Sequence, residues 1–332
     1  MPSKTGFTDP SDPFQVRAPQ TQTLPRFELR KPGIVLTETS GMTLPRRVLP
    51  GATYFVTRRC LGRRFLLRPD RELNDVFIYC LARAATKYRM EVHALCVMSN
   101  HYHIVLTDPQ GVLPLFAAWM NRQVAMCVKR LRRWDEVVWE PNVALSAVEL
   151  DGTKEVLDKI AYTILNPVSA GLVRSPEDWP GVLSTVAALR RGQVVGKRPS
   201  VWFKDTAPNE ATLRLTTPRG FADQGVYHEA LGALITHRLN TLHQRAGGYL
   251  GPARVKQTSV RDRPSSKKRR FGRNPMFSAL TRERWIEAVK RLRAFRHAYR
   301  EAYLAWRDGC DRIEFPLGTW WLVRYARAPI AA

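Results

Sequence analysis

The sequence predicts an α+β fold in which helices pack on a small antiparallel sheet. Two apolar runs, at 91–98 and 102–107, are split by Ser99-Asn100, a pattern typical of a β-hairpin. Segments with apolar residues at helical spacing come before and after this hairpin. One antiparallel sheet covered by helices is the natural arrangement for these elements.

The other elements of this fold follow one another between residues 50 and 173. The stretch Thr53–Thr57 is β-branched and aromatic and follows a Pro50-Gly51 turn, which indicates a first strand. A weaker strand is expected near 137–149. Apolar residues at helical spacing predict three helices, at 71–88, 113–134 and 154–165. The third is expected to end at Asn166-Pro167, because proline cannot continue a helix interior.

The charge of the chain favours an anionic partner. Its 332 residues include 53 Lys+Arg and 29 Asp+Glu, a formal net charge of +24, while 44% hydrophobic residues are enough to bury a core. Such a balance favours nucleic acid or an anionic surface. The charge is uneven, since residues 46–190 carry +6 and residues 251–332 carry +13.

Several classes of protein are excluded by the same inspection. No run approaches 18 apolar residues, so no membrane helix is expected, and the first residues lack the apolar core of a secretory signal. The five cysteines are scattered without a CxxC pair, which argues against a zinc knuckle or a disulfide framework. A reducing cytoplasm fits this cysteine usage best.

Composition divides the chain into five parts. They are a disordered arm at 1–45, a main domain at 46–190, a helical connecting region at 191–250, a basic linker at 251–275 and a mostly helical basic extension at 276–332. Within the last parts, helices are expected at 221–245 and 281–307 and a closing strand at 313–325. The long helix has an apolar side that includes Trp285 and Phe295, which predicts core contact.

The basic residues near the C-terminus are candidates for DNA contacts. A run of Lys and Arg between 254 and 273 can follow a phosphate backbone, although a solvated linker has the same composition. The basic face of the 281–307 helix has the same two interpretations. The candidates are Arg263, Lys267, Lys268, Arg269, Arg270, Arg273, Arg284 and Arg291.

Two short motifs carry chemistry. In His101-Tyr102-His103 the two imidazoles point to one face of a strand, where they form half of a divalent-metal site or are ordinary sheet histidines. Tyr102 then points to the core. Tyr162 and Asn166 are four residues apart and share one face of a helix, away from its apolar stripe. A tyrosine there is either a reactive group or a rim aromatic whose hydroxyl contacts water.

Together these motifs resemble a known family. The segment from Cys96 to Leu106 resembles the MxNHxHxl signature of single-tyrosine HUH transposases, which include the REP-associated tyrosine transposases. Residues 161–173 resemble the YIxxNPvxAGLv block of that family, 175–180 resemble the segment that follows it, and 50–57 resemble its first strand. The resemblance covers about residues 46–185. The loop 135–142 departs from the pattern, because acids replace expected basic groups there.

The resemblance implies a ferredoxin-like antiparallel sheet with packed helices, the HUH fold. It implies that His101 and His103 bind Mg²⁺ or Mn²⁺, that Asn166 is a third, amide-type ligand, and that Tyr162 is the catalytic nucleophile. The activity implied is that of a metal-dependent DNA transposase or endonuclease, which cleaves and rejoins single-stranded, hairpin or palindromic DNA through a 5′-phosphotyrosine. The protein would be cytoplasmic in a bacterium, bound to the nucleoid through DNA, and a monomer or homodimer.

Two alternatives remain open from the residues. The basic extension is also consistent with a domesticated protein that binds hairpins without cleaving them. A rolling-circle replication or relaxase-type enzyme would use the same chemistry, although the Tyr162 block and the modest length argue against it. The sequence leaves open the DNA target and whether Tyr162 acts on the metal site of its own chain or of a partner.

Overall fold

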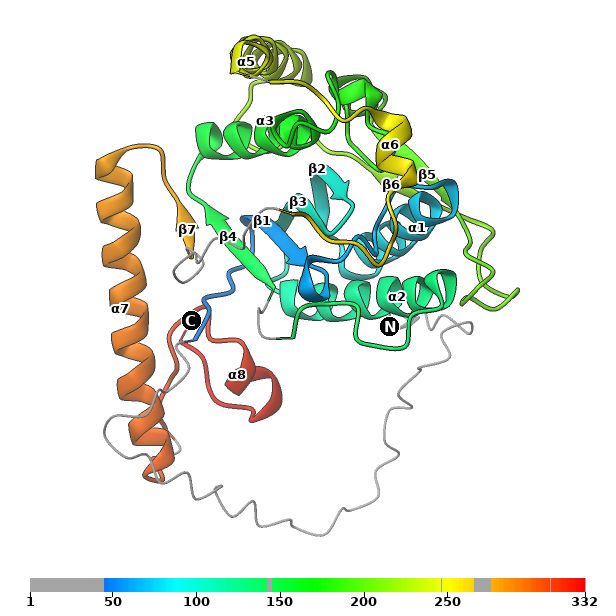
Figure 1. Ribbon diagram of the computed structural model, residues 1–332. Helices are drawn as coiled ribbons and strands as arrows, with labels where there is room; N and C mark the ends of the chain where they lie inside the picture. The colour runs from blue at the N-terminus through cyan, green and yellow to red at the C-terminus, as the bar shows by residue number, and fades with distance from the viewer. Residues whose placement is uncertain (1–44, 142–144, 246, 266–275, 311, 332) are drawn as a thin grey trace, which may run out of the picture.

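A five-stranded sheet forms the centre of the computed structural model (Figure 1), which describes residues 45–141, 145–245, 247–265, 276–310 and 312–331. The strands lie in the order β2 (Glu91–Met98), β3 (His101–Asp108), β1 (Ala52–Arg59), β4 (Ser146–Leu150) and β7 (Phe277–Ser278). The first four pair antiparallel, as predicted, and β7 adds in parallel to β4. The predicted arm, apart from residue 45, lies outside the described residues.

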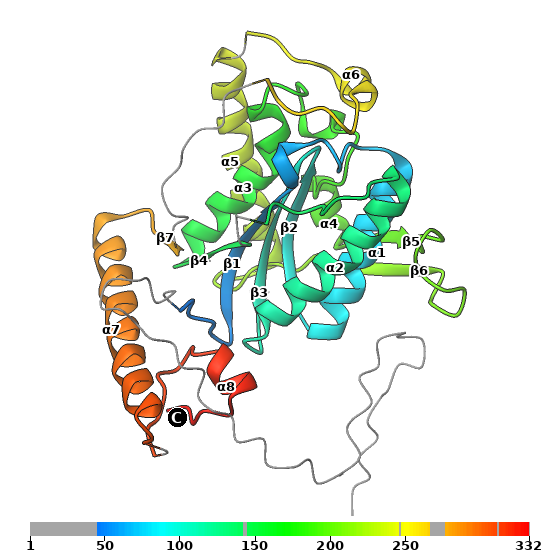
Figure 2. The same ribbon diagram turned by 60° about the horizontal axis from the view of Figure 1, so that its bottom comes forward.

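Helices cover both faces of this sheet (Figures 1 and 2). One face carries α1 (Arg71–Tyr88) and α2 (Leu113–Arg132), and the other carries α3 (Thr153–Ser169). From β1 to β4 the order is β-α-β-β-α-β, the chain order of a ferredoxin-like motif. Tyr102 is buried against the first face, where its hydroxyl donates to Asn121 on α2, as the alternation along the strand predicts.

The α3 helix is longer than predicted. It continues to Ser169, with Pro167 inside its last turn, so the expected end at Asn166-Pro167 is wrong. A proline this close to the C-terminus removes only one backbone hydrogen bond. Val168 compensates by packing with Cys96 and Met98 of β2 in a buried cluster. The helix therefore carries Tyr162 and Asn166 on one continuous turn.

The region after 190 begins with a hairpin that the sequence analysis missed. The strands β5 (Gln193–Lys197) and β6 (Glu210–Arg214) pair with each other and pack on α1. Gly196 makes this close approach possible, because a Cβ there would lie 2.6 Å from the backbone nitrogen of Tyr79. The predicted helical connecting region thus also contains a two-stranded hairpin, although its helix α5 (Gln224–Arg245) matches the predicted 221–245.

Four short helices lie between residues 61 and 257 of the described chain. The predicted linker 251–275 contains one of them, α6, whose Val255 is buried in the cluster with Val168. Their bounds are η1 (Leu61–Arg63), η2 (Pro176–Asp178), α4 (Val186–Arg191) and α6 (Pro252–Gln257). No helix among the described residues is long and apolar enough to cross a membrane.

The C-terminal extension contains the predicted long helix, α7 (Arg282–Arg307), but not the predicted strand. Instead of a strand at 313–325, Phe315 makes an isolated bridge to Ile330, and a short helix, α8 (Trp321–Tyr325), follows. Phe315 and Leu322 fold back on Ala302 of α7 to form a small separate core. The predicted apolar side of α7 is only partly buried, since Phe295 is buried but Trp285 is 54% exposed.

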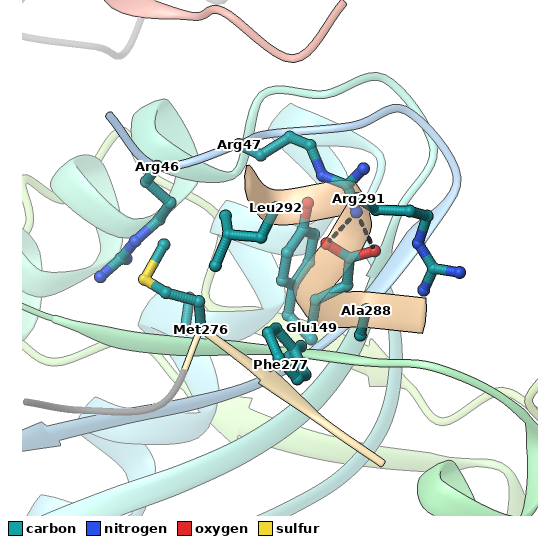
Figure 3. A pocket seen from close by; sticks show the side chains of 10 residues that line it. Arg46, Arg47, Glu149, Met276, Phe277, Ala288, Arg291 and Leu292 are labelled. Atoms are coloured by element: carbon teal, nitrogen blue, oxygen red, sulfur yellow. Dashed lines mark hydrogen bonds and ion pairs between the residues drawn. The ribbon is translucent and has the colours of Figure 1, made fainter. Parts of the chain in front are cut away.

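Ion pairs attach α7 to the sheet domain. Arg284 pairs with Glu155 at 3.2 Å, and Arg291 pairs with Asp151 at 2.5 Å. Figure 3 shows a small pocket at this junction, where Arg47 pairs with Glu149 at 2.9 Å. Among the residues that line this pocket, only Arg291 belongs to the predicted site residues.

Candidate active site

The two histidines of the HxH motif lie side by side at the start of β3. Their ring centroids are 4.7 Å apart, and both point to the α3 face, opposite Tyr102. In the sheet register Thr57 of β1 is opposite His103, and Arg59 is opposite His101. The alternation of the strand therefore gathers these four side chains on one surface.

Hydrogen bonds hold each imidazole through its Nδ1 atom. Nδ1 of His101 donates to the amide oxygen of Asn100 at 2.6 Å, so Nε2 of a neutral ring keeps its lone pair. Nδ1 of His103 is 2.8 Å from Oγ1 of Thr57. Nε2 of His103 is buried and has no hydrogen-bond partner among the described residues. Such an orphaned, oriented nitrogen is what a metal-binding imidazole presents.

Both imidazoles are kept neutral. Burial, together with the positive charges of Arg59 and Arg63, lowers the pKa of His101 to about 3. Burial, His101 and Arg59 likewise hold the pKa of His103 below its ordinary value. Neutral imidazole is the form that binds a metal ion.

Tyr162 faces His103 from α3, and Asn166 lies one turn further along the same helix. The ring centroid of Tyr162 is 5.6 Å from that of His103, and its side chain is 41% exposed, so a ligand can reach it. Burial raises the pKa of Tyr162, while a hydrogen bond with the Asn166 side chain and the charge of Arg59 act in the opposite direction. His101, His103 and Tyr162 are therefore brought together within one chain, with Asn166 beside Tyr162.

Phe55 of β1 is a site residue that the sequence analysis missed. Its ring stacks on His103 at a centroid distance of 5.0 Å and meets the ring of Tyr162 edge-on at 5.7 Å. A signal was present in the sequence, because Phe55 and Thr57 alternate on one face of the predicted first strand. What was missing was the strand register, which places that face beside the HxH motif.

An ion pair with α5 holds α3, the helix that carries Tyr162. Asp158, one turn before Tyr162, pairs with Arg238 of α5 at 2.5 Å and with Lys159 at 3.1 Å. Nζ of Lys159 in turn lies 5.7 Å from the ring centroid of Tyr162.

No group of three or more His, Cys, Asp or Glu that could hold a metal occurs in the described ranges.

The residues predicted to contact DNA fall into three groups, which are exposed, ion-paired or outside the described residues. Arg263 is exposed. Arg284 and Arg291 are engaged by carboxylates of the sheet domain, which gives them a role in attaching α7. The remaining candidates lie outside the described residues: Lys267, Lys268, Arg269, Arg270 and Arg273.

Comparison with known proteins places two transposase structures beside this chain. One, a REP-associated tyrosine transposase bound to a REP hairpin, is 20% identical, with a TM-score of 0.38, over 54% of this chain and 99% of that one. The other, a candidate transposase of Deinococcus radiodurans R1, is 21% identical, with a TM-score of 0.27, over 38% of this chain and 95% of that one. No family model and no curated protein sequence matches this chain.

Proposed function

We propose that this chain is a DNA strand transferase of the HUH type, in which Tyr162 forms a covalent link to single-stranded or hairpin DNA with the help of a divalent metal. The observation that carries the proposal is the position of the Tyr162 ring, 5.6 Å from the ring of His103, whose Nε2 atom is buried without a partner. A nucleophile beside an unsatisfied metal-ligand nitrogen is the arrangement that such a reaction needs.

The residues fit Mg²⁺ or Mn²⁺. His101, His103 and Asn166 would hold the ion, and the bound ion would polarise the scissile phosphate. Imidazole nitrogens alone would favour zinc, whereas the amide oxygen and the phosphate oxygens of bound DNA suit Mg²⁺ or Mn²⁺. The hydrogen bonds of Asn100 and Thr57 to the two Nδ1 atoms orient the rings for this role.

The reaction follows from the position of the phenol. Oη of Tyr162 attacks phosphorus, the bond from phosphorus to the 3′ oxygen breaks, and a 5′-phosphotyrosine and a free 3′-hydroxyl result. The phenolic proton is released to solvent, and the leaving oxygen takes up a proton. The phosphodiester energy is kept in the tyrosine ester, so a second hydroxyl can reverse the step without ATP.

The enzyme would act as a monomer on DNA in the bacterial cytoplasm. Tyr162 reaches the histidines of its own chain, which supports action in cis and a monomer that needs no second copy to complete the site. A DNA-bound protein in the bacterial cytoplasm, at the nucleoid, fits the charge of +24.

A denaturing gel tests the proposal. The protein is incubated with labelled hairpin oligonucleotides that carry single-stranded flanks, with Mg²⁺, Mn²⁺ or a chelator. We expect an adduct that migrates with the protein, requires metal and disappears in Tyr162→Phe. Tyr325→Phe, which changes another exposed tyrosine, is the matched control and should retain the adduct.

The second candidate, hairpin binding without cleavage, is favoured by the location of the charge, since residues 251–332 carry +13 and lie outside the site. It predicts binding that is indifferent to chelator and to Tyr162→Phe but strongly dependent on salt. An adduct that persists in Tyr162→Phe would refute the proposed nucleophile.

A further inference from the structure

Arg59 is a cation of the site that neither the motifs nor the metal chemistry accounts for. It is the last residue of β1, directly opposite His101 in the strand register. Residues 55, 57 and 59 alternate onto one face, so its side chain leaves the sheet on the same side as Phe55 and Thr57. Arg59 is exposed, and no side chain among the described residues pairs with its guanidinium.

The neighbouring Arg58 lies on the opposite face of β1, and its side chain is in a different environment from that of Arg59. Its guanidinium lies over the ring of Trp139, 5.6 Å from the centroid, and is half-buried in the fold. Arg58 thus has a structural partner, whereas Arg59 points to the site without one.

The charges around Arg59 favour an anion. Arg59 lies directly opposite His101 in the strand register, and Thr57 on the same face of β1 is hydrogen-bonded to His103. The carboxylate nearest to Tyr162 along α3, Asp158, is already engaged by Arg238 and Lys159. The described part of the site therefore contains an exposed cation that no described carboxylate neutralises, which favours the binding of an anion.

We propose that the guanidinium of Arg59 binds a non-bridging oxygen of the scissile phosphate while Tyr162 attacks. The inference rests on the proposed function and adds a substrate-binding residue to it. An arginine offers a planar fork of N–H donors that matches two oxygens of a phosphate. Negative charge grows on those oxygens as the fifth bond to phosphorus forms, so the donors stabilise the transition state more than the ground state. Arg59 acts only as a hydrogen-bond donor in this step and transfers no proton.

Chemical protection tests the contact without requiring cleavage. The full chain is treated with phenylglyoxal, which modifies arginine, in the presence and absence of a single-stranded hairpin oligonucleotide, and the modified peptides are quantified by mass spectrometry. We expect the oligonucleotide to protect Arg59 several-fold and to leave Arg71 unprotected. Arg71 is an exposed arginine at the start of α1, on the opposite face of the sheet. Equal modification of Arg59 with and without DNA would overturn the proposal.

Single-turnover kinetics test the role in the reaction. Arg59→Gln should lower the rate of adduct formation by about 10²–10³-fold, the usual effect of removing one such donor. Arg59→Lys keeps the charge but not the fork of N–H donors, so its rate of adduct formation should lie between those of the wild type and Arg59→Gln. The rate of Arg71→Gln should match the wild type. Affinity for the oligonucleotide, measured in a Tyr162→Phe background, should change less than the rate.

The two proposals fail separately. If the wild type forms a Tyr162-dependent adduct at the same rate as Arg59→Gln, the role of Arg59 is refuted and the proposed function stands. If no adduct forms at all but DNA still protects Arg59, the proposed cleavage is refuted and Arg59 remains a phosphate-binding residue.

Discussion

The ring of Phe55 stacks on the imidazole of His103, with centroids 5.0 Å apart and ring planes within 15° of each other. The same phenyl ring meets the edge of Tyr162 at 5.7 Å. The Phe55 side chain of β1 therefore contacts both the imidazole of His103 and the ring of Tyr162, the proposed nucleophile. It fixes their separation across two elements that are far apart in the sequence.

Phe55→Ala should lower the rate of adduct formation about tenfold, because small displacements of a nucleophile are costly in phosphoryl transfer. Phe55→Tyr, which keeps the ring, should restore most of the rate. Phe221→Ala, which removes a half-buried ring that packs on Tyr227, controls for general loss of packing. Single-turnover rates and thermal unfolding together check this, and an unchanged rate in Phe55→Ala would contradict it.

Thr57→Val should weaken metal binding by about tenfold, since partners that orient a ligand imidazole commonly contribute 10–100-fold to affinity. The variant removes the only hydrogen-bond partner of Nδ1 of His103 that is found among the described residues. Thr57→Ser should restore the affinity. Thr53→Val is the matched control, because Thr53 lies on the same face of β1 and bonds instead to Thr107 at 2.7 Å. Calorimetric titration with Mn²⁺ measures the difference, and equal affinities in the two valine variants would rule the role out.

His93 should make the fold less stable at acid pH. It is fully buried between the Thr216 carbonyl and Thr107 Oγ1, and burial, more than the charge of Arg219, lowers its pKa to about 4. Between pH 6.5 and 4 the unfolded chain binds a proton that the folded chain does not. The free energy of unfolding therefore falls as pH falls, by about 3 kcal/mol from this residue.

Urea unfolding across this pH range checks the prediction. His101 and His103 change stability in the same direction, so the test is the difference between the wild type and His93→Gln. The variant should have the flatter profile. Parallel profiles would show that His93 does not account for the loss.

Most of the sheet domain could be predicted because its signals are local. The hairpin around Ser99-Asn100 and the helices at 71–88 and 221–245 follow from periodicity alone. His101, His103, Tyr162 and Asn166 could be named as candidates because two motifs kept a recognisable spacing, and the first three lie together in the structure. Phe55 and Arg59 were missed because their roles depend on strand register, which no local pattern specifies.

The errors have physical causes as well. Pro167 is accommodated in α3 because Val168 is buried, a tertiary effect that outweighs the local rule. The aromatic run before 325 was expected to form a strand, but α8 leaves Trp321 62% exposed while Leu322 enters the small core beside α7. The partner that no local pattern could supply is Ala302 of α7, which packs with Phe315 and Leu322 in that core.

Arg284→Ala should lower the free energy of unfolding by about 2 kcal/mol, because it leaves a buried carboxylate with one partner fewer. Glu155 is only 1% exposed and accepts from Arg284 and from the backbone nitrogen of Leu280. Adding Glu155→Gln should recover part of the loss, since the neutral amide costs less to bury. Denaturant unfolding of both variants is the measurement, and a double variant less stable than Arg284→Ala would contradict the assignment.

This contact also determines how the proposed DNA role of the extension can be tested. Deleting residues 251–332 would remove β7 and the partners of Glu155 together with the basic charge, so it would confound affinity with stability. Neutralising the basic run by substitution avoids this difficulty. The variant changes six residues to Gln: Arg263, Lys267, Lys268, Arg269, Arg270 and Arg273.

For this sixfold variant we expect weaker binding of single-stranded hairpin DNA and a flatter dependence of affinity on salt. Each lost phosphate contact reduces the slope of log K against log salt by about 0.7 on single strands, so the slope should fall by up to about 4. Neutralising Arg282, Lys290, Arg293 and Arg300, exposed on α7, tests whether that helix contributes instead. If the sixfold variant keeps the wild-type slope and the α7 variant loses it, α7 contacts the phosphates and the basic run is a solvated linker.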